Sequence, residues 1–418
     1  MSNTKRVSTL LLSILLTATM CLADDWPQFR GPNRDGNSTE TDLLKKWPPS
    51  GPKLLWSVDG LGIGFSSAAI ADGFVYTTGM LDGEGFLFAY DLAGNLKWKE
   101  SYGPEWTRSY KGTRTTPTID GRRAYVFSGT GKMVCFNAGT GEKIWQVDTL
   151  EEFEAKNIQW GMTGSPLIDG PKVYCTPGGK KGAIVALDKM TGRTIWATAG
   201  LEETSTYSSP ILIERGANRL LINLIQKSIV CVAADTGKLL WREPYETPSD
   251  TGSGTPIYKD GCLYVTSAVE REFTTGGVMF ELSTDGTSVA RKWSDQTLDC
   301  GHGGVVLLDG YLYGSSFDGI PKGDWICLDW DSGKVMYKAT WNGNKGSIIH
   351  ADGMLYCYDE NTGDIALVKT SPKAFEIVSS FRVTQGSGKQ HWSHPSIANG
   401  RLYIRHGDAL MAYDIKAR

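Results

Sequence analysis

The chain has 418 residues, of which 21% are charged, and a formal net charge of −3 at pH 7. This mildly acidic balance argues against nucleic acid as a partner, because nucleic-acid binding needs clustered lysine and arginine. A chain of this length normally folds into two or more domains, unless a single repeat architecture uses all of it.

The N-terminus has the pattern of a secretory signal peptide. Lys5 and Arg6 precede an apolar run at residues 10–16, and a cleavage site follows Ala23. The run is too short to span a bilayer, and no later segment is apolar enough to do so. We therefore expect residues 1–23 to be removed and the protein to be exported to the periplasm or the extracellular space. Lipid attachment at Cys21 is the less favoured alternative, because the preceding residue is a bulky methionine.

Residues 24–52 have no regular apolar period and contain several prolines. We expect this segment to lie extended against the rest of the protein, anchored by Trp26, Phe29 and Trp47. The alternative is an arm that docks onto a partner.

From Gly64 onwards the sequence repeats a unit of about 45 residues. Each copy contains a strand of small residues, an Asp-Gly turn, an aromatic strand, a third apolar strand, a Thr-Gly turn and a strand ending in tryptophan. The clearest copies are Thr115–Trp145 and Gly164–Trp196. Four strands per unit predict a propeller, and the two turns supply the positive φ that tight hairpins require.

The unit recurs eight times, with one degenerate copy at Arg215-Gly216. The eighth copy ends without its tryptophan strand, but a strand of that kind stands alone at residues 53–58. Pairing the two would close the ring and leave no free sheet edge. We therefore predict an all-β, eight-bladed β-propeller of four-stranded antiparallel blades over residues 53–418. Its last blade is closed by the N-terminal strand, and we expect a monomer.

The tryptophan that ends each unit is too regular for a ligand site. We expect it to pack between adjacent blades, with the indole N–H donating to a backbone carbonyl of the neighbouring blade. The tryptophans with this structural role are Trp56, Trp98, Trp145, Trp196, Trp241 and Trp293.

The pattern Ala-x-Asp-x-x-x-Gly-x-x-x-Trp, complete at Ala186–Trp196, resembles the tryptophan-docking repeat of pyrroloquinoline-quinone (PQQ) propellers. The stretch Asp25–Pro32 also looks like the opening segment of exported propellers of the BamB-like type. This family includes both quinoprotein dehydrogenases and non-enzymatic scaffolds. The dehydrogenase branch implies a Cys-Cys pair, a calcium held by acidic and amide side chains, and a catalytic Asp. The chain has no Cys-Cys pair and no set of Glu, Asn and Asp at the positions of the innermost strands, and Asp250, Asp295 and Asp299 are expected in loops.

Long loops follow the outermost strands and several second strands, at residues 101–113, 149–163, 269–277 and 317–324. We expect them on one face, around a variable ring at the starts of the innermost strands. Packing alone would keep this ring uniform, yet it reads Phe65, Arg114, Thr163, Tyr207, Ser253, His302, Lys345 and Trp392. Aromatic rings beside cations suit a planar anion, a sugar or an extended peptide. The predicted ligand- or partner-binding site at the channel mouth comprises Arg114, Trp160, Tyr207, His302, Lys345, His391 and Trp392. The alternative is a polar funnel that holds only water.

Two other chemistries find less support. His391 and His394 could share a metal ion with His302, but residues three apart on an extended chain point to opposite faces. We therefore expect no metal site and no catalytic residues. The cysteines of the mature chain are expected to be buried as small apolar side chains.

The sequence thus predicts an exported, non-catalytic binding or scaffold propeller of the cell envelope. Its expected partners are envelope proteins or a small planar or anionic ligand, and no cofactor is expected. The rival prediction is a quinoprotein alcohol or sugar dehydrogenase that uses PQQ and calcium. A carbohydrate-binding or carbohydrate-cleaving propeller is a third reading, based only on the aromatic residues.

Overall fold

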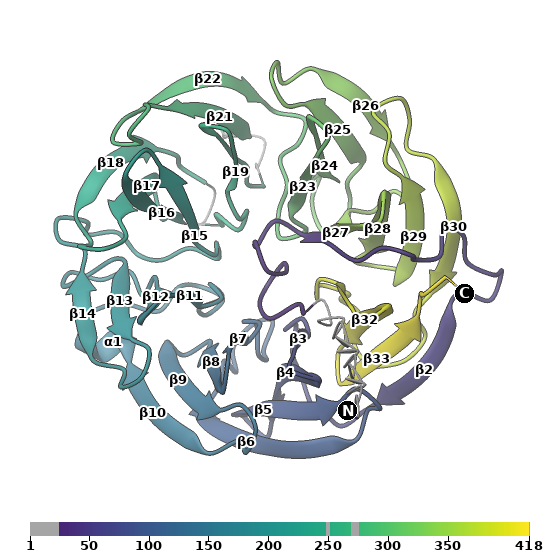
Figure 1. Ribbon diagram of the computed structural model, residues 1–418, viewed down its shortest axis with the longest axis horizontal. Coiled ribbons are helices and arrows are strands. Elements are labelled where there is room, and N and C mark those ends of the chain that lie inside the picture. The colour runs from purple at the N-terminus through teal and green to yellow at the C-terminus, as the bar shows by residue number, and fades with distance from the viewer. Residues whose placement is uncertain (1–24, 248–250, 269–275, 418) are drawn as a thin grey trace, which may run out of the picture.

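The computed structural model describes residues 25–247, 251–268 and 276–417. These residues form eight antiparallel sheets arranged as blades around a central axis (Figure 1). The predicted fold class, an eight-bladed β-propeller, is confirmed. The expected signal peptide, Cys21, Asp250 and most of the loop at 269–277 lie outside the described residues.

Blades 1 to 7 are each built from four consecutive strands, numbered outward from the channel. Their bounds are β3 Ala69–Ala71, β4 Phe74–Leu81, β5 Glu84–Asp91, β6 Leu96–Pro104; β7 Thr118–Asp120, β8 Arg123–Phe127, β9 Lys132–Asn137, β10 Lys143–Asp148; β11 Leu167–Asp169, β12 Lys172–Cys175, β13 Val185–Asp188, β14 Thr194–Ala197; β15 Ile211–Arg215, β16 Asn218–Ile225, β17 Ser228–Ala233, β18 Leu239–Pro244; β19 Ile257–Lys259, β20 Cys262–Val265, β21 Gly277–Leu282, β22 Val289–Asp295; β23 Val305–Leu308, β24 Tyr311–Ser315, β25 Trp325–Asp329, β26 Val335–Ala339; and β27 Gly346–Ala351, β28 Met354–Asp359, β29 Asp364–Lys369, β30 Ile377–Arg382.

The eighth blade joins the two ends of the chain. Its inner strands are β31 Ser396–Ala398, β32 Arg401–His406 and β33 Ala409–Asp414, and its outer strand is β2 Lys53–Val58. Strand β2 pairs antiparallel with β33, with Trp56 opposite Ala412. This pairing closes the ring as the sequence predicted.

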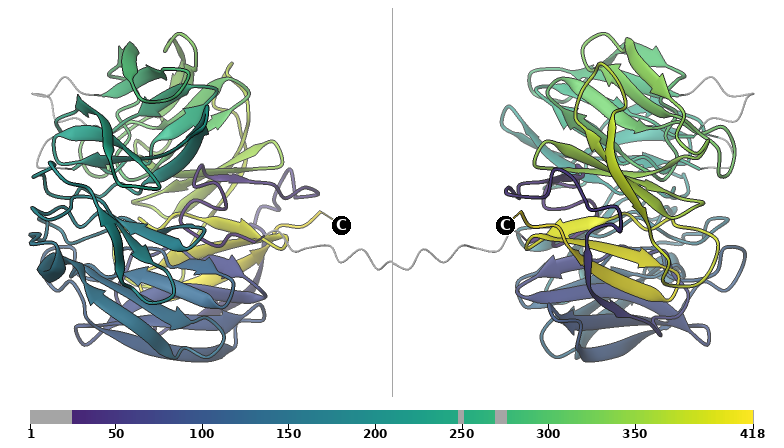
Figure 2. Two further views of the ribbon diagram at one scale, coloured as in Figure 1. Left: turned by 60° about the vertical axis from the view of Figure 1, so that its left-hand side comes forward. Right: turned by 90° about the vertical axis from the view of Figure 1, so that its right-hand side faces the viewer.

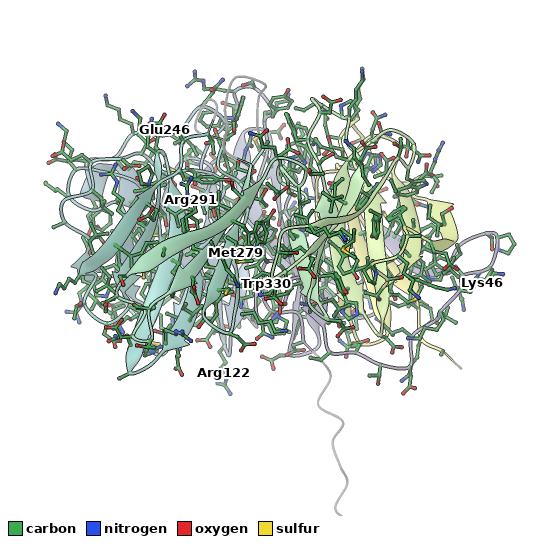
Figure 3. All side chains as sticks on the ribbon, turned by 90° about the horizontal axis from the view of Figure 1, so that it is seen from above. Lys46, Arg122, Glu246, Met279, Arg291 and Trp330 are labelled. Carbon is green, nitrogen blue, oxygen red and sulfur yellow. The ribbon has the colours of Figure 1, made fainter. Side chains whose placement is uncertain are left out.

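The Asp-Gly turns between the first and second strands have the backbone that the sequence implied. At the first of them, Asp72 has φ 50° and Gly73 has φ 79°. Two successive positive φ values define the mirror-image turn that matches the twist of a hairpin. These turns gather on one face, called here the turn face. The longer blade-to-blade loops lie on the other, called here the loop face. Figure 3 shows Arg122 of a turn and Glu246 of a loop on opposite sides of the ring.

The outer-strand tryptophans fasten each blade to the next. The indole N–H of Trp145 donates to the carbonyl of Lys189 at 3.1 Å, and that of Trp196 donates to Ala234 at 3.1 Å. Trp56, Trp98 and Trp241 make the equivalent bond at 2.8 to 3.1 Å. Trp293 differs from this expectation, because its indole nitrogen has no hydrogen-bond partner among the described residues, although its ring lies against Gly333 in the same way.

The N-terminal segment does more than lie against the propeller. Trp26 forms a bridge with Ile70 of blade 1, and β1 Asn37–Ser38 adds a parallel strand to the inner edge of blade 7. Between these points the chain crosses the centre of the ring (Figure 1), on the turn face (Figure 2). Trp47 is buried beside Tyr356 and Phe381. The segment therefore closes one end of the central channel.

Helical structure is scarce among the described residues, and most of the cysteines are buried between the sheets. One short helix, α1 Thr149–Glu152, lies in the loop between blades 2 and 3. Helices long and apolar enough to cross a membrane are absent from the described part of the chain. The seven cysteines from Cys135 to Cys357 are free thiols, and all but Cys262 are buried. Six of the seven thus have the burial expected of small apolar side chains, and Cys262 does not.

Candidate functional site

The channel opens on the loop face into a cavity of about 440 Å³. Its wall comes from the starts of the innermost strands, where each blade-to-blade loop turns into the channel. Seven of the eight predicted ring positions line it, namely Phe65, Arg114, Thr163, Tyr207, Ser253, His302 and Trp392. Side chains of the long loops complete the wall, namely Tyr110, Trp160, Thr251, Ala268, Phe317 and Ile320. The repeat therefore brings variable residues from distant blades into one concave site.

A belt of aromatic rings surrounds half of the mouth. Trp392 lies 5.0 Å from Phe65 and 5.1 Å from Tyr110, measured between ring centroids. Tyr110 continues the belt to Trp160 at 6.4 Å, and Trp160 meets Tyr207 at 5.7 Å. Such tilted and edge contacts are favourable aromatic geometries. The outcome is a continuous apolar surface that offers ring faces to an occupant.

Arg114 is the cation of this belt. Its guanidinium lies 6.0 Å from the centre of the Phe65 ring and donates to the carbonyls of Gly112, at 2.7 Å, and Tyr110. Burial lowers the pKa of Arg114 to about 10 despite the opposing charge of Glu105, so the side chain is still charged at neutral pH. Among the described residues, no Asp or Glu side chain lines the cavity. The described wall therefore carries the positive charge of Arg114, with the buried Glu105 near it but outside the lining.

Below the belt lies a layer of hydroxyls, each two residues after a ring position and just before an innermost strand begins. The backbone N–H of Ser67 donates to Thr116 Oγ1 at 3.2 Å, and that of Thr116 donates to Ser165 Oγ at 3.2 Å. The N–H of Ser165 continues the series to Ser209 Oγ at 3.0 Å. These bonds link blades 1 to 4. All four hydroxyl residues also line the cavity.

The floor of the cavity belongs to the N-terminal segment. Phe29 lines the cavity and packs edge-on against His394, with 5.0 Å between ring centroids. The neighbouring Arg30 and Arg34 are almost completely buried in the channel. Arg34 donates to the carbonyls of Ser165 and Pro166, both at 2.7 Å, directly at the hydroxyl layer. The cavity is thus a blind pocket, closed from below by residues far away in sequence.

Two predicted site residues lie elsewhere. Lys345 is buried, with its Nζ 2.5 Å from Glu360 Oε2, and does not line the cavity. Glu360 also faces His302, whose Nε2 is 3.0 Å away, without the alignment of a hydrogen bond. Burial alone would raise the pKa of Glu360, but these two partners hold it below its usual value. Lys345 therefore neutralises a buried carboxylate instead of meeting an occupant. Sequence could not show this, because Glu360 is not at a ring position.

His391 is the second predicted site residue that does not line the cavity. Its Nδ1 is 2.6 Å from the hydroxyl of Tyr358, and its ring stacks on His406 with 3.7 Å between centroids. His394 instead turns inward, where its Nε2 donates to the carbonyl of His302 at 2.6 Å. The two histidines point to different surroundings. Among residues 25–247, 251–268 and 276–417, no three His, Cys, Asp or Glu side chains converge on a common metal position.

Sequence reasoning missed several contributors to the pocket. Phe29 was expected only as an anchor, and Tyr110 and Phe317 were parts of long loops without an assigned role. The buried Arg30 and Arg34 belonged to a segment expected on the surface. The clearest available signal was the pair Phe29-Arg30 in a segment that otherwise has few apolar residues.

Residues 83–339, more than half of the chain, match the family model described as outer membrane protein assembly factor BamB. The chain belongs to the BamB family. This agrees with the resemblance that the tryptophan repeat suggested.

Curated relatives come from two functional groups. The BamB protein of Yersinia pestis is 25% identical over 283 residues, which cover 65% of this chain and 67% of that protein. A quinohemoprotein alcohol dehydrogenase of Pseudomonas putida, ADH-IIG, is 26% identical over 241 residues, 43% of this chain and 32% of the enzyme. The chain thus spans about two thirds of the first relative and a third of the second.

The similar solved structures also include both BamB proteins and quinohemoprotein alcohol dehydrogenases. BamB from Moraxella catarrhalis superposes with a TM-score of 0.61 at 17% identity, covering 87% of this chain and 99% of that one. A quinohemoprotein alcohol dehydrogenase from Comamonas testosteroni gives 0.66 at 14% identity, covering 94% and 81%. At these identities the likeness establishes the propeller fold alone.

Proposed function

We propose that this protein is an exported, non-catalytic scaffold propeller of the cell envelope, which holds partner proteins on its loop face around the aromatic pocket. The single observation that carries this proposal is the belt from Phe65 to Tyr207 at the mouth of a blind pocket. Tryptophan, tyrosine and arginine dominate the binding energy of protein interfaces when they are clustered and partly desolvated. Tyr110, 43% exposed, and Ile320, 57% exposed, extend this apolar surface onto the rim.

Membership of the BamB family supports the envelope setting, because relatives carry the name outer membrane protein assembly factor. We place the protein in the periplasm or outside the cell as a monomer, following the expected signal peptide at residues 1–23. Release after cleavage remains preferred to a lipid anchor at Cys21.

The proposal is tested by site-specific photo-crosslinking in the cells that make the protein. A photoreactive residue at Tyr110, on the loop face, should give discrete adducts with envelope proteins, and Trp160→Ala in the same chain should weaken them. The same residue placed at Arg122, on the opposite face, is the matched control. Equal adduct patterns from the two faces, or none from Tyr110, would contradict the proposal.

The rival function is a quinoprotein alcohol or sugar dehydrogenase, favoured by the similarity to ADH-IIG. The residues present do not fit its cofactor set. The aromatic belt and Arg114 suit a planar anion, but calcium requires several carboxylate or amide oxygens. No carboxylate lines the pocket among the residues that the structure describes, and Glu360 outside the lining is engaged by Lys345.

A titration with PQQ and calcium decides between the two functions. Saturable thermal stabilisation with dye-linked alcohol oxidation would establish the enzyme and end the scaffold proposal. A glycoside hydrolase is disfavoured for a related reason, because its chemistry needs two carboxylates facing the substrate.

A further inference from the structure

The hydroxyl layer at the bottom of the pocket contains O–H groups whose protons have no hydrogen-bond acceptor among the described residues. The oxygens of Thr116, Ser165 and Ser209 each accept a backbone N–H from the neighbouring blade. A hydroxyl that accepts in this way still has its own proton to donate. None of these three protons goes to an acceptor within the described residues, and all three residues line the cavity. The layer therefore presents a row of donors toward an occupant.

Positive charge surrounds this row above and below. Arg114 stands two residues before Thr116 in the segment that leads into β7, and Arg34 donates to the carbonyl of Ser165 from the floor segment. Arg30 lies beside it in the floor segment and donates to the carbonyls of Val305 and Asp35. The hydrogen-bond acceptors of both floor arginines are carbonyl and amide oxygens, not carboxylates. Buried charges of one sign in a low-dielectric channel attract an oppositely charged group into it.

The two features occupy the same half of the ring. The aromatic belt runs from Trp392 at the start of blade 8 to Tyr207 at the start of blade 4. The hydroxyl row covers blades 1 to 4 and lies deeper in the channel, each of its residues following a ring position by two residues. An occupant of this half would place a flat apolar group in the belt and an oxyanion below it.

We propose that the pocket binds a small aromatic carboxylate. Its ring lies among Trp392, Tyr110 and Trp160, and its carboxylate accepts hydrogen bonds from the Thr116–Ser165–Ser209 row near Arg114. The N-terminal segment is part of the site, because Phe29 sets its depth and the two floor arginines supply its positive potential. The volume of about 440 Å³ suits a single ligand of this kind. The part of the lining that the structure describes contains no carboxylate to repel the ligand's own.

This inference rests on the proposed function in one respect, since both use the same pocket. Isothermal titration of the mature protein with indole-3-acetate is the direct test. Two matched probes separate the contributions. Indole-3-acetamide keeps the ring without the charge, and cyclohexylacetate keeps the charge without the aromatic ring. We expect one saturable site for indole-3-acetate and at least tenfold weaker binding of each of the other two.

Variants locate the site. Arg114→Gln should weaken indole-3-acetate tenfold or more and leave the weak binding of the amide unchanged, whereas Arg122→Gln on the turn face should change neither. Phe29→Ala should weaken both the acid and the amide, because it removes the floor. Thermal melts of each variant show whether it is folded.

Equal affinity for the acid and the amide, or an acid that binds Arg114→Gln as tightly as wild type, would overturn the inference. Absence of binding at millimolar indole-3-acetate would also overturn it. Crosslinks at Tyr110 without any ligand binding would remove the inference alone. Ligand binding without crosslinks would remove only the scaffold proposal.

Discussion

Acid should destabilise this propeller through one buried histidine of the pocket floor. His394 is 4% exposed, and its Nε2 donates to the carbonyl of His302 while its Nδ1 has no partner among the described residues. Burial, and after it the charge of Arg30, lower the pKa of His394 to about 3. The unfolded chain has the ordinary histidine pKa near 6.5. Below pH 6.5 the unfolded state therefore binds a proton at His394 while the folded state does not, so the free energy of unfolding falls as the pH falls.

The size of the effect follows from the two pKa values. At pH 4.5 the unfolded histidine is protonated and the folded one is not, so the loss is about 2 pH units at 1.36 kcal/mol each, or about 2.7 kcal/mol. The loss is almost absent at pH 7.5. For a chain of this length the entropy of unfolding is about 0.8 kcal/mol per degree, and His394 alone should lower the melting temperature by about 3 °C between these two pH values.

The variant His394→Phe isolates this contribution. It keeps a ring against Phe29 but cannot titrate, and it leaves the His302 carbonyl unpaired at a cost of about 1 kcal/mol. Its melting temperature should lie about 1 °C below wild type at pH 7.5 and about 2 °C above it at pH 4.5. Differential scanning calorimetry across this range measures both. Melting curves that stay parallel with pH would refute the assignment, as would an NMR titration of His394 with a midpoint near 6.5.

Two further predictions concern the blade contacts. Trp145→Phe should cost about 1 kcal/mol more stability than Trp293→Phe, because only Trp145 loses a hydrogen bond, the one to Lys189. Equal losses in urea unfolding would contradict this role of the indole N–H. Gly192→Ala should destabilise the protein by roughly 1–2 kcal/mol because of the positive φ, and by more because the new Cβ would meet the Trp145 ring. Gly200 has a similar positive φ but open space around it, so Gly200→Ala should show only the cost of the backbone conformation. Indistinguishable melting temperatures for the two glycine variants would show that the ring can move aside.

The fold could be predicted almost completely from the sequence because the repeat states it eight times. Five of the eight copies place a Gly against the tryptophan ring of the preceding blade, as Gly192 lies against Trp145 and Gly237 against Trp196. Turn chemistry, strand period and packing therefore agree with one another in most blades. Even the degenerate copy at Arg215-Gly216 forms its turn, between β15 and β16.

The pocket could be predicted only in part, and the errors have a physical pattern. Ring positions come from the repeat alignment, so most of them were placed correctly. Lys345 was not, because a neighbouring carboxylate that the alignment does not reach draws it inward. The aromatic belt also depends on Tyr110, whose loop geometry is set by contacts that no repeat encodes. Loop conformation and buried charge pairing are tertiary properties, and a single sequence does not show them.

The positions where the repeat is broken show where the N-terminal segment enters the channel. The hydroxyl layer reads Ser67, Thr116, Ser165, Ser209, Thr255, Gly304, Ser347 and His394 in blade order, so only two of its eight positions lack a hydroxyl. Both exceptions lie where that segment enters the channel. A Cβ at Gly304 would overlap the Arg30 guanidinium, and His394 packs against Phe29. The hydroxyl layer is thus interrupted only in blades 6 and 8, where the floor segment occupies the space, and is continuous over blades 1 to 5. Gly304 and His394 break the repeat because they make room for Arg30 and contact Phe29.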